Sequence, residues 1–457
     1  MKDPERRLAE AIDFALLNGL LKYTPQGRLA HAPFALTPSP QPARAMARLE
    51  ALTVPFNALA WRVAGDVPFL RAALEPAARH DTFLRNLLSL TGTADRDQPL
   101  RLLVTRNDYL MQIGDTPADD VPRQVELNTI SAAYAGLAGR VHALHAHLLA
   151  GQPEAARLLP NDPLVGIVEA VSQAHGRYGQ PGAVCLMVIQ PEERNIFDQR
   201  LFEFALLRRG IATRRLSLPQ LAGEGALREG HLVVRGEVAA LTYFRAGYGP
   251  EDYATPDALR ARALIEASST IAVPDVATQL AGAKKVQQLL TDPATLARFC
   301  PPEQGKAMAA VFVGQYEPQA SLTLGSRKLP AWEAACAEPV RYVLKPQREG
   351  GGNNLYDQAM AEALRGMSAE QRDAYILMER IVSRPHDALT VVEGVPRGGP
   401  HVSEIGRFGV LLAEGRRELL NRDVGYLVRT KAESSLESGV SAGFGHLDSL
   451  LAVDTSS

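Results

Sequence analysis

The chain has 457 residues, of which 46% are hydrophobic and 22% are charged, and its 49 Lys and Arg residues are balanced by 51 Asp and Glu residues. This composition is typical of a globular protein of about three domains, each of roughly 150 residues. A formal net charge of −2 excludes a broad basic surface for nucleic acid, and no apolar stretch reaches the roughly 18 residues of a membrane span. The three cysteines lie far apart and form neither a disulfide framework nor a CxxC metal motif. We therefore expect a cytoplasmic protein in which locally placed charges bind any ligand.

The first third of the chain predicts mostly helices, followed by two strands. Residues 1–30 open with an amphipathic helix pattern, and the proline-rich stretch 33–42 predicts an irregular connector before a largely helical segment. The pattern changes near residue 100. Residues 100–105 are typical of a buried strand, and residues 123–130 alternate like a second one.

The middle of the chain, residues 183–244, has the order of a βαβ unit. It predicts a strand, a helix that ends at Gly210, another strand and then a pair of strands. Alternation of strands and helices of this kind favours a compact α/β unit.

A second series of elements begins at Pro274. It predicts a helix near residues 279–290, a strand at 341–345 and a glycine-rich loop at 350–352. After Ala374 the pattern becomes rich in strands, with Gly415 at a turn between two of them.

The segment 342–356 reads YVLKPQREGGGNNLY, in which a predicted strand carries Lys345 and is followed by Glu349 and three glycines. Glycines expose backbone N–H groups to close approach, so the loop can fold around a phosphate. The glycines alone would favour a flexible surface loop, but a lysine for phosphate and a carboxylate for Mg²⁺ favour a nucleotide site. The chain has neither a P-loop motif nor a GxGxxG dinucleotide motif.

A second cluster lies in VELNTISAAYAGLA, where Glu126 and Asn128 are two residues apart on a predicted strand. Their side chains therefore point to the same face of the sheet. Two oxygen-bearing side chains at a strand end suit a hard cation such as Mg²⁺, which takes only one or two carboxylates from a protein. The alternative from this segment alone is the exposed polar face of an antiparallel strand.

Residues 191–200, PEERNIFDQR, follow a predicted strand at its carboxyl end, where open α/β sheets bind ligands. Glu193, Asn195 and Gln199 are candidates for the ammonium and carboxylate ends of an amino-acid-like ligand. The alternative is an ordinary helix start, with Asp198 or Asn195 as its cap.

Two further strands end in basic side chains. Arg245 follows a strand in YFRAGYGPEDY and is suited to bidentate carboxylate recognition. Arg429 and Lys431 share one face of LVRTKA, which precedes the glycine-containing loop GVSAGFG. Taken singly, either segment is equally consistent with a surface strand that forms salt bridges.

These segments, in this order, resemble the eukaryotic-type glutathione synthetase family, whose members are ATP-grasp ligases. The resemblance runs from about Leu100 to Asp448, through ELNTISA, ERNIFDQR, YFRAGY, ATQLAGAKKVQQ, LKPQREGGGNNLY, ILMERI, SEIGRFGV and LVRTKA. It implies an α/β ATP-grasp fold with an inserted parallel-sheet substrate-binding domain and a Gly-rich lid. The expected division is 1–182 and 284–457 for the ATP-grasp body and 183–283 for the inserted domain.

The resemblance also implies a reaction. ATP phosphorylates the cysteinyl carboxylate of γ-glutamylcysteine, and the amine of glycine displaces phosphate from the acylphosphate to give glutathione. The expected cofactor is Mg²⁺, two ions per site, with ATP as co-substrate. The expected assembly is a homodimer with only small-molecule partners, without nucleic acid or membrane.

Site residues are implied by the same resemblance. The residues implied in catalysis are Arg429, Lys345 and Glu349, and those implied as metal ligands are Glu126, Asn128 and Glu349. The ATP site would comprise Glu126, Lys284, Lys345, Gly350, Gly351, Asn354, Tyr356, Met378, Glu379, Arg380, Ile381, Glu404 and Lys431. The peptide substrate would contact Arg106, Ser131, Glu193, Asn195, Gln199, Arg245, Tyr248, Arg429, Val440 and Ser441.

The sequence departs from the family's usual motifs at two positions. NTISAA places Ala133 where NTISAS is usual, and SGVSAG places Ser441 where GGVAAG is common. Both positions fall near the substrates in the resemblance. The acceptor amine is therefore expected to be glycine, with β-alanine or serine as alternatives.

Overall fold

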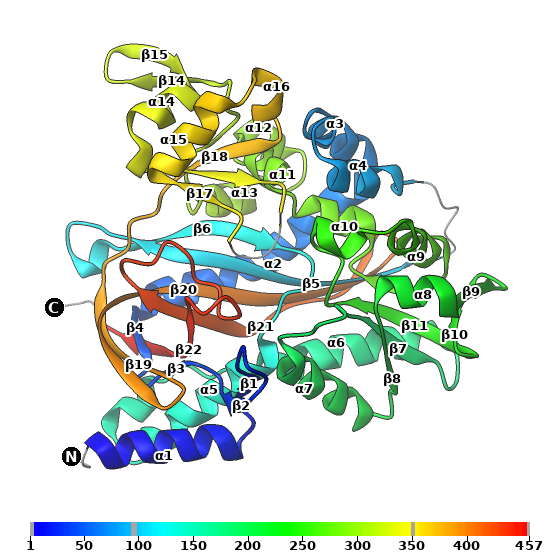
Figure 1. Cartoon of the computed structure of the whole chain (residues 1–457), viewed down its shortest axis with the longest axis horizontal. Helices are drawn as coiled ribbons and strands as arrows, with labels where there is room; N and C mark the ends of the chain where they lie inside the picture. Colours follow the sequence, from blue (N-terminus) through cyan, green and yellow to red (C-terminus); the bar gives the residue numbers. More distant parts are fainter. Residues whose placement is uncertain (1–3, 93–97, 349–351, 455–457) are drawn as a thin grey trace.

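The computed structural model describes residues 4–92, 98–348 and 352–454. At its centre lies a seven-stranded sheet in the order β19-β3-β22-β21-β20-β5-β6, in which only β22 and β3 pair in parallel (Figure 1). Its strands are β3 (Phe34–Ala35), β5 (Leu100–Gln112), β6 (Val121–Asn128), β19 (His386–Val392), β20 (Val395–Glu414), β21 (Arg417–Ala432) and β22 (His446–Asp448).

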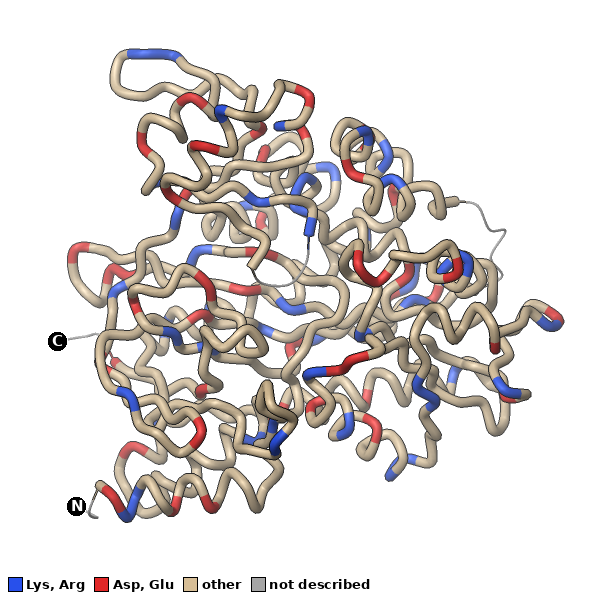
Figure 2. Tube along the Cα trace, viewed as in Figure 1, with Lys and Arg blue, Asp and Glu red and all other residues tan. Residues whose placement is uncertain are grey.

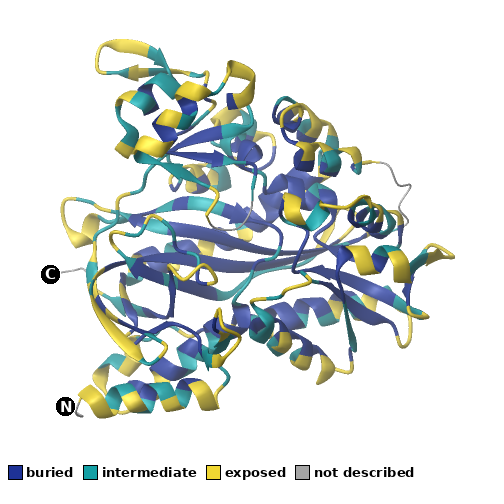
Figure 3. Ribbon diagram, viewed as in Figure 1, coloured by how far each residue is buried: buried dark blue, intermediate teal, exposed yellow. Residues whose placement is uncertain are grey.

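Helices cover both faces of this sheet. Leu103 of β5 packs with Ala60 of α2 (Ala43–Gly65), whereas its neighbours Leu102 and Val104 join a cluster formed with α5 (Ala135–Leu148) and α6 (Pro163–Tyr178). Alternate residues of a strand point to opposite faces, so both faces of β5 are apolar. Figure 3 shows the resulting layer of buried residues through the middle of the molecule, with exposed residues at its edges.

The predicted strands near residues 100 and 123–130 are confirmed as β5 and β6, although β5 continues to Gln112. The predicted turn at Gly415 is also confirmed, because Gly415 has a φ of +58° in the two-residue turn between β20 and β21. A positive φ is readily adopted by glycine, which has no Cβ to clash with the backbone.

The prediction of an irregular connector at residues 33–42 is wrong. The segment contains β3 and β4 (Ser39–Pro42), and β4 pairs in parallel with β23 (Leu450–Val453). Pro40 and Pro42 lack an N–H, but a strand with a partner on one side only tolerates proline where the N–H would face away. The partner strand lies some four hundred positions away in sequence, so a local pattern contains no sign of it.

The βαβ prediction is confirmed. Strands β7 (Val184–Val188) and β8 (Thr213–Leu216) flank α7 (Ile196–Leu207), and β7, β8, β11 (Glu237–Phe244) and β12 (Ile271–Val273) pair in parallel. The sheet is mixed, however. Strand β10 (His231–Val234) pairs antiparallel with both β9 (Gly225–Arg228) and β11. The tight turns Glu229–Gly230, with φ values of +51° and +79°, and Arg235–Gly236, with φ values of +52° and +84°, join them as hairpins.

The single helix predicted near 279–290 is instead two helices, α10 (Val276–Ala281) and α11 (Lys284–Leu290). A Cβ at Gly282 would lie 2.4 Å from Thr129 Oγ1, so this close packing requires glycine. The side chain of Gln287 donates to the Gly282 carbonyl at 2.6 Å. The break starts a new helix at Lys284.

A smaller sheet packs above the central one (Figure 1). Its order is β13-β18-β16-β17, with β16 confirming the strand predicted at 341–345. Its strands and helices are β13 (Gln315–Tyr316), β16 (Tyr342–Pro346), β17 (Leu355–Tyr356), β18 (Tyr375–Glu379), α14 (Ala331–Ala337), α15 (Asp357–Gly366) and α16 (Ala369–Arg372), with the hairpin β14 (Ser321–Leu324) and β15 (Arg327–Pro330) beside them.

The remaining helices lie around these sheets. They are α1 (Pro4–Leu17), α3 (Val67–Ala78), α4 (Thr82–Ser89), α8 (Leu218–Glu224), α9 (Pro256–Ala267), α12 (Pro293–Ala297) and α13 (Pro302–Ala309). Helix α1 confirms the predicted amphipathic N-terminal helix. A hairpin of β1 (Leu21–Tyr23) and β2 (Leu29–His31) follows it. Across the described ranges, no helix combines the length and hydropathy needed to cross a membrane. Acidic and basic residues are interspersed throughout the fold (Figure 2).

Candidate active site

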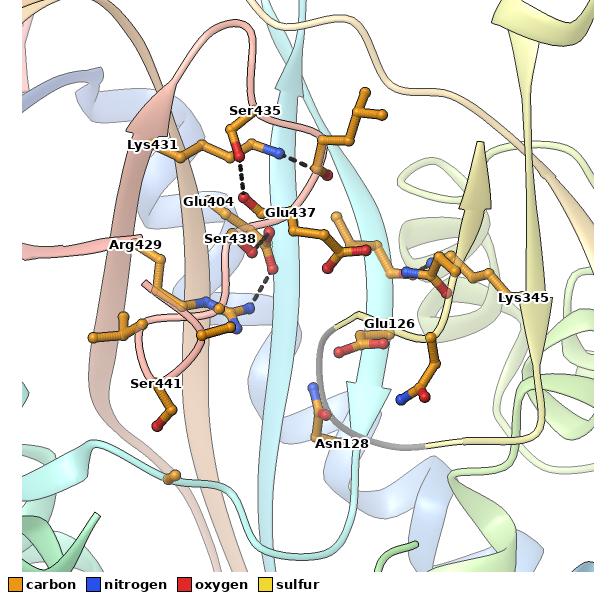
Figure 4. Close-up of a pocket in the computed structure, with 18 of the residues that line it drawn as sticks. Glu126, Asn128, Lys345, Glu404, Arg429, Lys431, Ser435, Glu437, Ser438 and Ser441 are labelled. Carbon is orange, nitrogen blue, oxygen red and sulfur yellow. Dashed lines mark hydrogen bonds and ion pairs between the residues drawn. The ribbon is translucent and has the colours of Figure 1, made fainter. Parts of the chain in front are cut away.

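A cavity of about 1670 Å³ opens between the central sheet, the smaller sheet and the loop after β21 (Figure 4). It is lined by side chains from segments that are far apart in sequence. The residues assigned by the resemblance that line it are Arg106, Glu126, Asn128, Ser131, Glu193, Asn195, Gln199, Arg245, Tyr248, Lys345, Asn354, Tyr356, Met378, Glu379, Arg380, Ile381, Glu404, Arg429, Lys431, Val440 and Ser441. The structure therefore brings nearly all of the proposed site together.

Of the assigned residues that the structure describes, Lys284 is not part of this lining. It is buried next to Glu126, and its Nζ lies 3.2 Å from Glu126 Oε2. Glu349, Gly350 and Gly351 lie outside the described residues. Their predicted roles therefore stay predictions.

Glu126 is surrounded by cations. Burial alone would raise the pKa of its carboxyl group, but Lys284 and Lys345, with smaller contributions from Arg429 and Arg106, hold that pKa well below its usual range. Glu126 is consequently an anion in the free protein at neutral pH.

Lys345 comes from β16 and reaches toward β6. Its Nζ donates to the Val125 carbonyl at 2.9 Å, and burial lowers its pKa despite the nearby charge of Glu126. A phosphate placed against this lysine would favour the ammonium form, because an added negative charge stabilises the cation. The geometry suits phosphate binding.

Asn128 is held in a fixed orientation. Its Nδ2 donates to the Arg106 carbonyl at 3.2 Å and to Asp108 Oδ2 at 3.0 Å. With both amide hydrogens engaged, the side chain can offer a cation only its oxygen.

This donor chemistry fits Mg²⁺, which takes carboxylate, amide and phosphate oxygens. Within the described part of the chain, no group of three His, Cys, Asp or Glu residues is placed to hold a metal ion alone. Glu126 and Asn128 would thus need phosphate oxygens, water or a further side chain to complete the coordination of Mg²⁺.

Arg429 on β21 lies between two carboxylates. It donates to Asp108 Oδ2 at 2.8 Å and also contacts Glu404 Oε1. Burial lowers the pKa of Arg429, but Glu404, Asp108 and Glu126 outweigh that effect and raise it. Glu404 in turn accepts a hydrogen bond from Ser438 of the loop after β21, at 2.5 Å.

Arg245 stands at the end of β11 and pairs with Asp198 at 3.1 Å. Asp198 had been a candidate cap of its own helix, α7, but it caps α5 instead: its carboxylate accepts from the backbone N–H of Tyr134 and Gly136 at 2.8 and 2.9 Å. The N-cap of α7 is Asn195, whose side chain makes no capping hydrogen bond. The helix-start alternative is thus correct about the helix and about Asn195 as its N-cap residue, although neither the Asn195 nor the Asp198 side chain caps α7.

Some buried polar atoms in the cavity region have no hydrogen-bond partner among the described residues. These atoms are Glu193 Oε2, Arg245 Nε and Arg429 Nε. Leaving such groups unpaired costs about 1–3 kcal/mol each, so they are suited to contacts with a polar ligand. One carboxylate and two guanidinium groups match the ammonium and carboxylate groups of an amino-acid-like substrate.

The opposite end of the cavity is lined by residues of the smaller sheet. Glu379 of β18 accepts from Tyr316 at 2.9 Å, Arg380 pairs with Asp357 at 2.7 Å, and the phenol of Tyr356 accepts from Asn354 at 3.4 Å. These contacts order residues that the resemblance assigns to the ATP site.

Sequence reasoning missed several residues here. Asp108, two positions after Arg106 on one strand, was detectable from the two-residue period of a strand. Tyr134, whose hydroxyl contacts Ser441 Oγ, and Glu437, which accepts from the Gly352 N–H at 3.2 Å, lie in loops without a periodic pattern.

Comparisons with known proteins identify relatives of this chain over nearly its full length. Residues 3–452 match the family model described as eukaryotic glutathione synthase, ATP binding domain. The chain is 38% identical to a glutathione synthetase of Homo sapiens over 462 residues, covering 97% of this chain and 96% of the relative. It is 34% identical to a chloroplastic glutathione synthetase of Arabidopsis thaliana over 469 residues, covering 98% of this chain and 85% of the relative.

A solved structure shares the fold. The apo form of a glutathione synthetase-like effector from Globodera pallida aligns with a TM-score of 0.79 and 21% identity, covering 99% of this chain and 98% of that one. Its low identity supports the mixed α/β fold alone. With the family model spanning almost the entire sequence and relatives well above 30% identity over nearly full length, this chain belongs to the eukaryotic glutathione synthase family.

Proposed function

We propose that this protein is an ATP-dependent ligase that joins γ-glutamylcysteine to glycine and gives glutathione, ADP and phosphate. Its family membership supports this activity, since relatives named glutathione synthetase match it over nearly the full length. The observation that carries the proposal further is the convergence of the ATP-assigned and peptide-assigned residues on one cavity.

The proposal includes an ATP-grasp arrangement. ATP would lie between β16–β18 of the smaller sheet and β5–β6 of the central sheet, under a lid formed by the glycine-rich segment 349–352 and the loop after β21. The division into a body of residues 1–182 and 284–457 and an inserted substrate domain of 183–283 belongs to the same proposal. The parallel strands β7, β8, β11 and β12 support a distinct sheet in the inserted segment.

The chemistry needs activation because a carboxylate is a poor acyl donor. Transfer of the γ-phosphoryl group from ATP to the cysteinyl carboxylate forms an acylphosphate, and the glycine amine then attacks the carbonyl carbon as the C–O bond to phosphate breaks. Lys345 and Lys284 would neutralise phosphate charge, while Arg429 would lie beside the reacting carboxylate. Positioning and charge stabilisation account for most catalysis of this type.

The peptide end would be held by Glu193 and Arg245, whose unpaired buried atoms match an amino acid's ammonium and carboxylate groups. Val440 and Ser441 lie in the loop that would cover the substrates. Covering is chemically necessary because water would hydrolyse an exposed acylphosphate before the amine attacks.

Glu126, Asn128 and Glu349 are the residues that would hold Mg²⁺, two ions per site. When bound, Mg²⁺ supplies neutralisation of phosphate charge. Replacing Glu349 with Gln should remove most Mg²⁺-dependent turnover while leaving thermal stability unchanged. Unaltered turnover of this variant would exclude Glu349 as a ligand.

The decisive assay is coupled ADP production with γ-glutamylcysteine, in the presence and absence of glycine. We expect sustained turnover only with both substrates. A panel that replaces glycine with β-alanine or serine tests the acceptor, and the family relationship lends those alternatives no support. Equal or faster turnover with an alternative amine, or none with glycine, would overturn the proposal. The homodimer and the cytoplasmic location stay predictions.

A further inference from the structure

Asp108 lies at a junction of the site without lining the cavity itself. It is completely buried on β5, and its carboxylate binds three cavity residues from three strands. Arg106 of the same strand donates to both oxygens, at 2.7 and 2.8 Å, while Asn128 of β6 and Arg429 of β21 donate to Oδ2 at 3.0 and 2.8 Å. One carboxylate thus fixes three side chains that the proposed function places on the substrate and the metal.

We propose that Asp108 is a positioning residue for the ligase reaction, an inference that rests on the proposed function. Free guanidinium side chains populate several rotamers, and ordering them during catalysis costs conformational entropy. The bidentate bond from Arg106 and the bond from Arg429 remove this freedom before substrate binds. Asp108 also helps to fix which atom of Asn128 faces a cation, since one amide hydrogen points to Asp108 and the other to the Arg106 carbonyl, which leaves the oxygen available.

The neighbouring strand, β20, has a glycine where it passes this carboxylate. β20 lies between β5 and β21, and Gly406 of β20 is the residue directly opposite Asp108. A Cβ at Gly406 would lie 2.4 Å from Asp108 Oδ1 and 2.8 Å from Arg106 Cδ, both far too close. Because position 406 has no side chain, the Asp108 carboxylate and the Arg106 side chain have room to lie against β20.

The Gly406 geometry provides a second, independent way to disturb the junction. Gly406→Ala removes no charge and no hydrogen-bonding group, but it must displace the Asp108 carboxylate or the Arg106 side chain. Its kinetic defects should therefore resemble those of a change at Asp108 itself.

The first variant to test is Asp108→Asn, which keeps the shape but replaces one acceptor oxygen by a donor amide. We expect a ten- to hundredfold loss of kcat, the range seen when supporting partners of catalytic ligands are removed. The Mg²⁺ concentration for half-maximal activity and the KM for γ-glutamylcysteine should both rise severalfold, through Asn128 and through the two arginines. The KM for glycine should change least.

The structure offers a matched control in the same sheet. Asp423 of β21 also accepts a bidentate bond from a buried arginine, Arg407 of β20, at 2.9 and 2.5 Å, but neither residue lines the cavity. Asp423→Asn should lower the unfolding temperature by an amount comparable to Asp108→Asn and leave the Mg²⁺ and γ-glutamylcysteine requirements unchanged.

The outcomes separate this inference from the proposed function. If the unmodified protein makes no glutathione, the proposed function fails. If it is active, the positioning role is refuted by an Asp108→Asn variant whose Mg²⁺ requirement and KM for γ-glutamylcysteine equal those of the unmodified protein. The role is equally refuted if Asp108→Asn, like Asp423→Asn, alters only the unfolding temperature. Titration calorimetry of γ-glutamylcysteine with Asp108→Asn supplies a readout without turnover, and unweakened binding would likewise count against the role.

Discussion

A buried carboxyl group should make the stability of this protein depend on pH. Asp448 of β22 is 1% exposed, and burial raises its pKa to about 7 although Thr430 Oγ1 and the backbone N–H groups of Ser449 and Ser39 donate to it. In the unfolded chain the same group has a pKa of about 3.9. The folded state therefore binds a proton that the unfolded state releases between about pH 4 and 7.

The sign follows from proton linkage. Where the folded state binds more protons, the free energy of unfolding falls as pH rises, and it stops falling above the folded pKa. A shift of about three pKa units corresponds to roughly 4 kcal/mol across this range, or about 1.4 kcal/mol per pH unit. Asp448 thus destabilises the fold most above pH 7 and contributes no destabilisation near pH 4.

The test compares the natural chain with Asp448→Asn. Asparagine mimics the protonated acid, because its amide can donate to Thr430 while its oxygen still accepts from the Ser449 N–H. Urea unfolding at intervals from pH 4 to 8 gives the difference in free energy of unfolding between the two proteins, in which other titrating groups cancel. We expect the free energy of unfolding of the variant to rise steadily relative to that of the natural chain up to pH 7. A difference that stays constant across the range would show that Asp448 is ionised in the fold.

Three further changes test the site. Arg245→Ala should raise the KM for γ-glutamylcysteine by roughly 10- to 100-fold, the equivalent of a lost hydrogen bond to a charged group, and the KM for ATP far less; the opposite pattern in steady-state kinetics would argue against the peptide assignment. Glu126→Gln should lower kcat about 100-fold and raise the Mg²⁺ concentration needed for activity, because it removes the anion between two lysines. A change in the KM for glycine alone would contradict the metal assignment. Tyr134→Phe removes the hydroxyl that contacts Ser441 and should raise the KM for glycine by about two- to tenfold. An unchanged KM for glycine would show that this contact does not contribute to glycine binding.

The lining of the cavity was largely predictable from sequence because many of its residues stand in short motifs at strand ends. Glu126 and Asn128 share a face by the two-residue period of a strand, and they do line the same cavity. Lys345 was predicted on a strand that precedes a glycine-rich loop, and β16 carries it. The ordered set of motifs also identified the family that the comparisons report.

Local patterns by themselves established the type of most elements, the turn at Gly415 and the candidate ligands, because each depends on residues within a few positions of one another. Only the tertiary structure decided which distant groups meet. The strand at 39–42 exists because β23 pairs with it, Asp198 caps a helix other than its own, and Asp108 acquires partners on β6 and β21. A hydrogen bond between segments hundreds of residues apart depends on how the whole chain packs, and that information is absent from any local stretch of sequence.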